Sequence, residues 1–439
     1  MDKGAPWTER FGQRRVAGER TISTLRNQRS ASAEWRAHWP VVLAAGSGMA
    51  LSTLLSYSLG IFIEPLQKEF GWSRADVTSG QIISAAMAIV FGPVVGSMID
   101  RVGPRRIGIC ACFAMCLATA LLSMAGPSLD LWRGLWVVVA VAVVMIQPTV
   151  WTSAITHLFT AGRGLALAVT LCGSGIASLI TPPLTYMLIE YYGWRTAFIL
   201  LPLIWGCLVI PIVGILFRTP RDRLPAARDR SLSTGQTAGQ VIRSEVLTIR
   251  FACLAAAGLA FAAVVVTLAV SVVPLLSDYG LTRGEAAALA SLIGIAAIAG
   301  RLAIGLLLDR VTARYIAALC ACLPMVGASL LLAGSGSAPM AVAAVLVFGL
   351  SLGAELDILA YLTSRYFSQA HFGFLFGIMG GLLTLAGGAG PVVINAVYDA
   401  TGSYRLALMA AVPICLTAAL LFLSLGPIPQ RAAIGDRAS

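Results

Sequence analysis

Apolar stretches of about 20 residues recur along almost the whole chain and constrain its fold more than any other feature. A helix of this length spans the hydrocarbon core of a bilayer, and only helices or closed barrels satisfy their backbone hydrogen bonds in lipid. The composition agrees, because 12% of the residues are charged, against about 25% in soluble domains. We therefore predict an all-α membrane protein. Its twelve transmembrane helices are expected at residues 39–63, 77–98, 107–126, 131–156, 164–189, 196–217, 250–277, 286–308, 315–334, 338–362, 373–398 and 404–426.

Positive charges are distributed unevenly between the two ends of these predicted helices. Of the 31 lysines and arginines, most lie in the tail 1–38 and in the loops on the same side as that tail. Cytoplasmic loops carry such an excess, so the sequence predicts a multi-pass protein of the inner membrane with both termini in the cytoplasm. The net charge of +11 then reflects topology, and we expect no nucleic-acid partner. The opposite side holds Lys68, Arg74, Arg133, Arg195, Arg283 and Arg405.

The chain matches itself at a constant offset of 209 residues. The turn at residues 70–74 meets the turn at 279–283, and Pro182 meets Pro391. A repeat of this length predicts two pseudo-symmetric bundles of six helices, joined by a polar, arginine-rich linker. The predicted segments are a cytoplasmic tail at 1–38, an N-terminal bundle at 39–217, a cytoplasmic linker at 218–247, a C-terminal bundle at 248–426 and a cytoplasmic tail at 427–439.

A glycine-rich, charged motif follows the second predicted helix. Gly92 and Gly96 are one helical turn apart, which lets a neighbouring helix approach closely. Asp100 and the basic cluster that includes Arg101 and Arg105 can then form a charged clasp at the cytoplasmic face. The alternative is ordinary loop charge that serves topology. A weaker copy follows at Gly305, Asp309 and Arg310.

This motif and the two parallel halves resemble the major facilitator superfamily, whose substrate site lies near the membrane midplane between the halves. In that superfamily the clasp holds the outward-open state and breaks as the protein opens inward. Three further stretches resemble the monocarboxylate transporter branch and its bacterial relatives, which include oxalate/formate antiporters. These stretches cover residues 57–74, 163–195 and 353–367. The resemblance is specific for the branch but not for the substrate.

Arg301 is the only charged residue in the apolar run from Leu289 to Leu308. A guanidinium at membrane depth is costly, so it usually marks a substrate or ion pathway. The branch resemblance implies that Arg301, in a pattern with Gly305 and Asp309, binds the substrate carboxylate. Arginine suits this role, since its planar fork donates two parallel hydrogen bonds to a carboxylate. Alternatively, an acid on a neighbouring helix neutralises Arg301, which then serves packing.

The chain also departs from the animal members of the branch. The proton-linked Asp found one turn before the Arg is replaced by Ala297, and the Lys of the first helix is missing near Tyr57. The resembling dicarboxylate antiporters use a second cation on the eleventh helix, whereas residues 373–398 contain none. A single intramembrane cation favours a monoanionic cargo over a dianion, and aromatic side chains leave lipophilic anions open. We expect the substrate to be lined by Tyr57, Gln147, Trp151, Tyr361 and Asn395.

Two acids on the tenth predicted helix are the candidates for proton coupling. Asp357 lies ~12 Å from the cytoplasmic end of its helix, at the same depth as Arg301. Substrate binding to Arg301 would deprive Asp357 of its counter-charge, so that Asp357 accepts a proton. A static structural pair is the alternative. Glu355 points to another side of the helix and is the second candidate.

These features predict a secondary transporter that takes up a small organic anion, a monocarboxylate or an aromatic carboxylate, together with a proton. The alternative is an exporter of drugs or metabolites on the same fold. The sequence holds no nucleotide loop, catalytic pair or metal set, so we expect neither an enzyme nor a cofactor. The expected partners are the cargo, the proton and the lipid bilayer, and the protein is expected to be a monomer.

Glycines and prolines at 173–183 and 387–391 are expected to make the fifth and eleventh helices flexible, and these helices would then move during transport.

Overall fold

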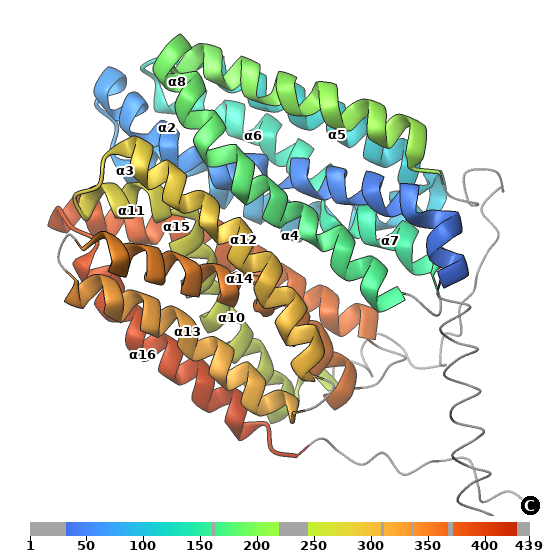
Figure 1. Ribbon diagram of the computed structural model, residues 1–439. Helices are drawn as coiled ribbons and strands as arrows, with labels where there is room; N and C mark the ends of the chain where they lie inside the picture. Colours follow the sequence, from blue (N-terminus) through green and yellow to red (C-terminus); the bar gives the residue numbers. More distant parts are fainter. Residues whose placement is uncertain are drawn as a thin grey trace, which may run out of the picture.

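A computed structural model describes residues 32–159, 163–218, 245–308, 311–334, 337–367 and 372–427. Helices connected by short turns make up these ranges, and no strand occurs within them (Figure 1). In the same ranges, 11 helices are long and apolar enough to cross a membrane. One of them, Leu165–Leu216, has 52 residues and contains two of the predicted spans. The structure thus confirms the prediction of an all-helical, multi-span membrane protein.

Gly193 divides the longest helix, α8 (Arg163–Leu216), into two segments that fold back on each other (Figure 1). Its φ of 79° and ψ of 162° are not helical, and a positive φ is accessible to glycine without steric cost. A side chain at this position would strain the turn. Two of the predicted transmembrane helices therefore pack as a pair, although hydrogen bonding continues almost without interruption between them.

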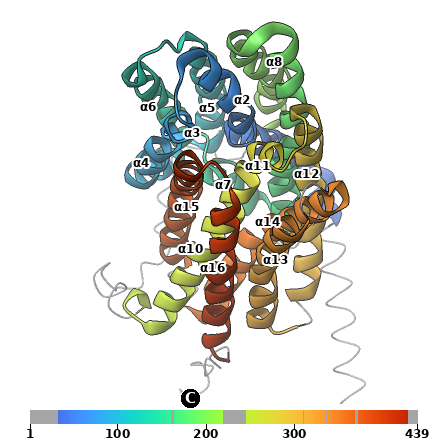
Figure 2. The same cartoon turned by 90° about the vertical axis from the view of Figure 1, so that its left-hand side faces the viewer.

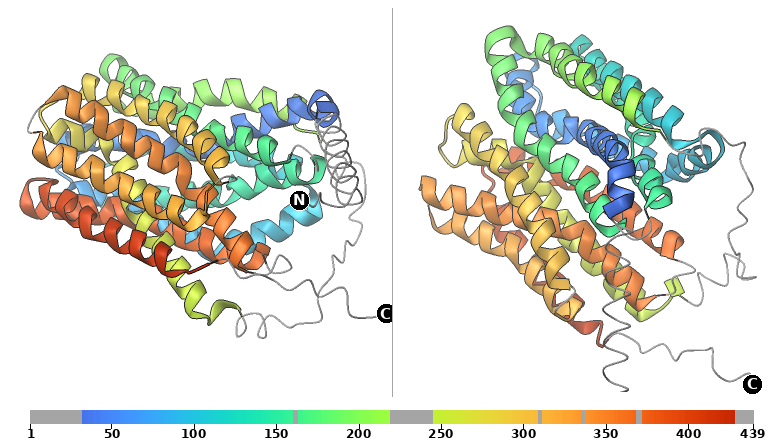
Figure 3. Two further views of the ribbon diagram at one scale, coloured as in Figure 1. Left: turned by 60° about the horizontal axis from the view of Figure 1, so that its bottom comes forward. Right: turned by 45° about the vertical axis from the view of Figure 1, so that its right-hand side comes forward.

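The helices form two groups, which lie one above the other in Figure 1 and remain distinct in the perpendicular view of Figure 2 and in Figure 3. The N-terminal group consists of the helical residues 32–52, α2 (Leu54–Phe70), α3 (Arg74–Thr78), α4 (Gly80–Val102), α5 (Pro104–Leu121), α6 (Leu129–Met145), α7 (Pro148–Leu158) and α8. The C-terminal group consists of α10 (Ile249–Val270), α11 (Val272–Asp278), α12 (Arg283–Leu308), α13 (Ala313–Ala333), α14 (Ala338–Tyr366), α15 (Phe372–Thr401) and α16 (Arg405–Ser424).

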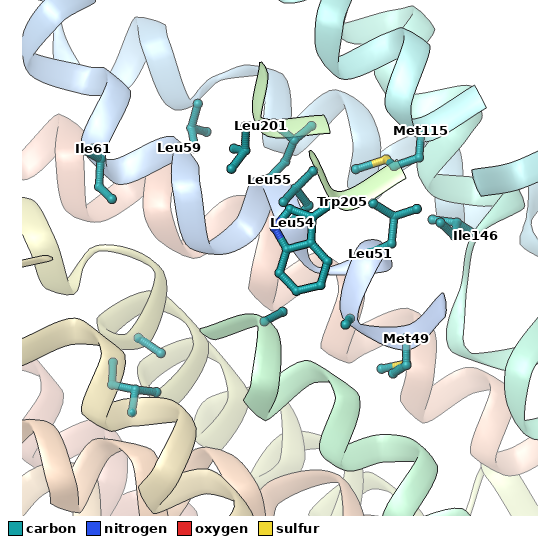
Figure 4. Packing of buried hydrophobic residues seen from close by; sticks show 14 of the residues in the cluster. Met49, Leu51, Leu54, Leu55, Leu59, Ile61, Met115, Ile146, Leu201 and Trp205 are labelled. Carbon is teal, nitrogen blue, oxygen red and sulfur yellow. The ribbon is translucent and has the colours of Figure 1, made fainter. Parts of the chain in front are cut away.

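Large apolar side chains fill the interior of the N-terminal group. Figure 4 shows Leu54 and Leu55 of α2 beside Leu201 and Trp205 of the second segment of α8, and all four are buried. Lipid tails are as apolar as leucine, so close packing rather than transfer out of water favours this association. The chain therefore needs side chains that interlock, and α2 is held among its neighbours by such contacts.

The two groups approach each other closely where small residues face a helix of the other group. A Cβ on Gly294 of α12 would collide with the carbonyl oxygen of Gly175 in α8, and a Cβ on Gly388 of α15 would collide with Ala85 of α4. Ala85 and Gly294 correspond at the offset of 209 residues. The sequence repeat is therefore visible as two equivalent contacts between the groups.

The predicted soft points are not where the helices break. α8 is helical through residues 173–183, and α15 is helical through 387–391, because a transmembrane helix tolerates proline where neighbouring helices pack against it. A break does occur before Pro148, since proline disfavours the α conformation of the residue that precedes it. The interruptions lie at Thr53, Gln147 and Ser271, in the first, fourth and seventh predicted helices.

Candidate functional site

Arg301 lies on α12 and its guanidinium meets a carboxylate of α14. Its Nε is 3.6 Å from Oδ2 of Asp357, and the side chain of Arg301 is only 9% exposed. The two helices come close because Gly353 of α14 packs directly against the backbone of Ala297 in α12, where a Cβ would collide. The structure therefore brings together the cation and the acid that the sequence places at equal depth.

One nitrogen of this guanidinium, Nη1, is buried and has no hydrogen-bond partner among the described residues. A buried donor without an acceptor costs about 1–3 kcal/mol, and more when it is charged. Asp357 faces only the Nε edge of the fork and is itself 24% exposed. Arg301 therefore keeps a free donor inside the protein, which a purely structural ion pair would not require.

Glu355, the second candidate for proton coupling, lies within electrostatic range of the same arginine. The residue is 5% exposed, and the positive charge of Arg301 acts on its carboxyl group. Both Glu355 and Arg301 act in turn on the phenol of Tyr57. Asp357 forms the ion pair with Arg301, and Glu355 is a second acid within electrostatic range of the same guanidinium.

The N-terminal group contributes uncharged side chains to the same place. Tyr57 of α2 and Cys172 of α8 lie within electrostatic range of Arg301, and Cys172 also of Asp357. Tyr57 borders a cavity of about 10 Å³ between the two groups, which is room for about one water molecule. A larger cargo therefore requires the helices to separate here. Cys172 is not predictable as a site residue from the sequence, because a cysteine within an apolar run carries no signal of its own.

Tyr361 and Gln147 occupy positions from which they can line a pathway. Tyr361 lies one turn beyond Asp357 on α14, and the guanidinium carbon of Arg365 is 5.9 Å from the centre of its ring. Gln147 is half-buried at the break between α6 and α7. A Cβ on Gly92 would lie 3.5 Å from Oε1 of Gln147, so this amide faces α4. Both residues remain candidates for the wall of the pathway.

Trp151 and Asn395 have other surroundings than the sequence suggested. Trp151 is 0% exposed, and its ring fills the space left by Gly48 and Gly108 inside the N-terminal group. The ring is thus packed inside the N-terminal group in this conformation, and its assignment as a substrate-lining residue stays a prediction. Asn395 is 1% exposed, and its Oδ1 accepts a hydrogen bond of 2.6 Å from the hydroxyl of Tyr404. This amide belongs to a polar network near the start of α16.

The glycine-rich, charged motif at the end of α4 and the start of α5 shows only part of the predicted geometry. No described heavy atom would lie within 4 Å of a Cβ on Gly96, so the close helix approach expected at this glycine stays a prediction. Arg105 donates from Nη2 to the carbonyl oxygen of Gly214 at 2.7 Å and thus caps the end of α8 within its own group. Gly305 lies in α12. The side chains of Asp100 and Arg101, and all of Asp309 and Arg310, lie outside the described residues, so the clasp stays a prediction.

Relatives of known function include two kinds of transporter. Human "Monocarboxylate transporter 12" is 26% identical over 286 residues, which cover 57% of this chain and 54% of that protein. Human "Monocarboxylate transporter 11" is 28% identical over 182 residues, or 40% of this chain and 38% of that protein. "Riboflavin transporter RibJ" of Trypanosoma brucei brucei is 28% identical over 222 residues, or 45% of this chain and 37% of that protein. The chain thus matches between about a third and about half of the length of these distant relatives.

Solved structures of transporters share the fold. A bacterial homologue of the human lysosomal transporter Spinster, in an inward-facing and occupied conformation, superimposes with a TM-score of 0.67 and 16% identity over 89% of this chain and 97% of that chain. The nucleoside transporter NupG gives a TM-score of 0.72 with 11% identity over 88% of this chain and 100% of that chain. The sequence pattern of the Major Facilitator Superfamily matches residues 45–362 and, again, residues 255–438. The chain therefore belongs to the Major Facilitator Superfamily and is a secondary transporter, not an enzyme.

Proposed function

We propose that this transporter takes up a small organic monoanion, a monocarboxylate or an aromatic carboxylate, together with a proton. One observation carries the proposal: Nη1 of the buried Arg301 has no hydrogen-bond partner in the part of the chain that the structure describes, while Asp357 lies 3.6 Å from Nε of the same guanidinium. The distant monocarboxylate transporters support this class of cargo. We also propose that the chain belongs to the bacterial branch that resembles oxalate/formate antiporters.

The cargo carboxylate would accept hydrogen bonds from the free edge of the Arg301 guanidinium. Charge-assisted bonds of this kind are stronger than neutral ones, and one cation balances one negative charge. Tyr57 of the N-terminal group adds a hydroxyl within electrostatic range of Arg301. A dianion would need a second cation, and residues 373–398 supply none. A monoanion is therefore the best match to this site.

Proton coupling would follow from competition for the same guanidinium. A carboxylate in a protein interior is stabilised by a nearby cation and becomes costly when that cation is taken away. A cargo that engages Arg301 removes the counter-charge of Asp357, so Asp357 takes up a proton, and Glu355 is the second acceptor. The loaded site then holds no uncompensated charge while the protein changes conformation.

Alternating access would move the bundles 39–217 and 248–426 against each other around this site. Contacts between small residues, such as Gly294 against Gly175, support such a motion because few side chains interlock there. The uneven distribution of arginines supports an inner-membrane location with both termini in the cytoplasm. A monomer suffices for transport, since one chain supplies all the residues of the site.

A second candidate cargo is an uncharged aromatic ring system with hydrogen-bonding edges. The observation that favours it is the presence of two acids, Asp357 and Glu355, around a single arginine. Asp357 alone balances the charge of Arg301, and Glu355 is a further acid nearby, so the site does not demand a negative charge on the cargo. A riboflavin transporter is among the distant relatives, which agrees with such a cargo.

Uptake by purified protein in proteoliposomes distinguishes these candidates. Labelled monocarboxylates, dicarboxylates and riboflavin are supplied with and without an inward proton gradient. We expect monocarboxylates to enter, dicarboxylates to be excluded, and the gradient to drive accumulation. Uptake of riboflavin but of no carboxylate would refute the anion proposal in favour of the second candidate, and normal monocarboxylate uptake by Arg301→Ala would refute the anchor.

A further inference from the structure

A carboxylate of the C-terminal group holds the first turn of α3. The backbone N–H of Arg74 donates to Oδ1 of Asp399 at 3.0 Å, and that of Ala75 donates to Oδ2 at 2.8 Å. The guanidinium of Arg74 lies 3.6 Å from the centre of the Tyr398 ring, and its Nη1 donates to the hydroxyl of Tyr404 at 2.9 Å. One short segment of the N-terminal group is thus bound by three residues of the C-terminal group.

This contact continues into a chain of hydrogen bonds that returns to α3. The hydroxyl of Tyr404 donates to Oδ1 of Asn395, and Nδ2 of Asn395 donates to Oγ1 of Thr78 at 3.5 Å. Figure 2 looks onto this end of the molecule and shows α3 lying against α15. We call Arg74, Asp399, Tyr398, Tyr404, Asn395 and Thr78 the first arm.

A second arginine crosses between the groups in the opposite direction. Arg283, at the start of α12, places Nε 3.0 Å from Oε2 of Glu64 and donates from Nη2 to the carbonyl oxygen of Ile61 at 3.1 Å. Both partners belong to α2. We call Arg283, Glu64 and Ile61 the second arm.

The two arginines correspond to each other in the repeat. Arg74 and Arg283 are separated by the offset of 209 residues, so each half provides one arginine at the turn after its first helix. The acids they meet do not correspond, because Asp399 matches Glu190 and Glu64 matches Val273. The repeat therefore explains both arginines and the acids at Glu190 and Asp399, but Arg283 pairs with Glu64, which has no acidic counterpart in the other half.

We infer that the two arms form a double latch that closes one end of the transport pathway, the end at which α3 and α11 lie. A cargo can reach Arg301 from this end only when both arms have opened. The ion pair of Arg283 and Glu64 is partly exposed, at 25% and 41%, and such pairs are individually weak. Each arm can thus open during a transport cycle, and closure depends on the two arms together.

A neighbouring polar cluster serves as the matched control. Glu69 of α2 accepts hydrogen bonds from Trp194 and Arg195 of α8, at the same end of the molecule but entirely within the N-terminal group. Lys68 pairs with Glu64 within α2 at 2.6 Å, so Lys68→Gln controls for the loss of that pair when Glu64 is replaced. Neither control removes a contact between the groups.

Labelling of a native thiol tests the latch without knowledge of the cargo. The other eight cysteines are replaced by alanine or serine, so that Cys172, beside Arg301 and Asp357, is the remaining thiol. A membrane-impermeant maleimide is added to the side of proteoliposomes or cells that faces α3. We expect Asp399→Asn and Glu64→Gln each to raise the labelling rate roughly two- to fivefold, and their effects to multiply if the arms are independent. Cys172→Ser sets the background.

Two results would overturn the latch. The first is an unchanged labelling rate in Asp399→Asn, Glu64→Gln and the double variant. The second is an equal increase in Glu69→Gln or Lys68→Gln, which would indicate general loosening. Arg283→Lys keeps the charge while losing the bond to Ile61, so it probes the second arm should another variant fold poorly. Since the readout is labelling, the latch can fail while carboxylate uptake stands, and the reverse holds as well.

Discussion

Equivalent positions in the two halves of the repeat carry different chemistry. At the offset of 209 residues, Arg301 corresponds to Gly92 and Asp357 to Pro148. In the C-terminal group these positions form an ion pair between two unbroken helices. In the N-terminal group Gly92 faces the amide of Gln147, at a break in the helix.

The repeat accounts for the arrangement of the helices in both halves, but it does not account for the charged residues, which occur at this place in one half. The duplicated scaffold brings the second and fourth helices of each half together, so both halves offer a place where two side chains meet. Only one half uses that place for charges, while the other supplies neutral groups such as Tyr57 and Cys172. Two arginines would suit a dianion, whereas a single arginine with acids beside it suits a monoanion that travels with a proton.

The largest expected effect is the loss of the C-terminal charge. Arg301→Ala should abolish carboxylate uptake, because no other side chain at the site carries a positive charge. Arg301→Lys keeps the charge but loses the fork, and a lost charged hydrogen bond is worth ~1.5–3 kcal/mol, or roughly 10- to 150-fold in affinity. Gly92→Ala is the matched control at the equivalent position, since its Cβ would make only ordinary contact with Gln147. Equal losses in Gly92→Ala and Arg301→Ala would erase the difference between the halves.

The next largest effect is expected from replacing Asp357, the acid of the ion pair, and it concerns proton-driven accumulation. Asp357→Asn should leave exchange of cargo across the membrane largely intact while reducing its accumulation against a gradient. Breaking a buried ion pair by removing one partner costs ~3–5 kcal/mol, less here because Asp357 is 24% exposed. The variant that lacks both Arg301 and Asp357 should therefore be obtained in higher yield than either single variant. Full proton-driven accumulation by Asp357→Asn would shift the proton site to Glu355.

A smaller effect should come from the packing that positions the pair. Gly353→Ala would place a Cβ against the carbonyl group of Ala297 and push α14 away from α12. Overpacking of this kind costs ~1–3 kcal/mol, which thermal unfolding in detergent measures as a lower Tm. Gly96→Ala is the control, because its Cβ would have no described atom within 4 Å. A stability of Gly353→Ala equal to that of Gly96→Ala would show that the close approach is not needed.

The fold was accessible from the sequence because its signals are local. Lipid requires long apolar helices, and the offset of 209 residues reveals the two halves without any contact being known. The depth of Arg301 and Asp357 along their helices was also sufficient to bring them together. Helix breaks were harder to predict, since prolines in α8 and α15 are absorbed by packing while the proline after Gln147 is not.

At the candidate site, the direction in which each side chain points was the hardest property to predict from the sequence. Trp151 is an aromatic residue of the kind that often lines a binding site. In the structure its ring packs against two glycines of other helices, and the sequence does not reveal this contact. Glu355 lies within electrostatic range of Arg301, although its position two residues from Asp357 directs it to another side of the helix. The crossing arginines were within reach of the sequence, because Arg74 and Arg283 align in the repeat, but their partners were not.

The smallest effect on cargo affinity is expected from a residue of the N-terminal group, and it tests how much the neutral half contributes to binding. Tyr57→Phe removes one hydroxyl near Arg301 and Glu355 and keeps the ring that borders the small cavity. A neutral hydrogen bond contributes ~0.5–1.5 kcal/mol, or roughly 2- to 12-fold in affinity, which is less than the charged bond of Arg301. We therefore expect a modest rise in KM at an unchanged proton dependence. Tyr315→Phe, which is exposed and contacts Arg314, should leave KM unchanged. A loss in Tyr57→Phe as large as that in Arg301→Lys would mean that the neutral half holds the cargo as strongly as the charged half.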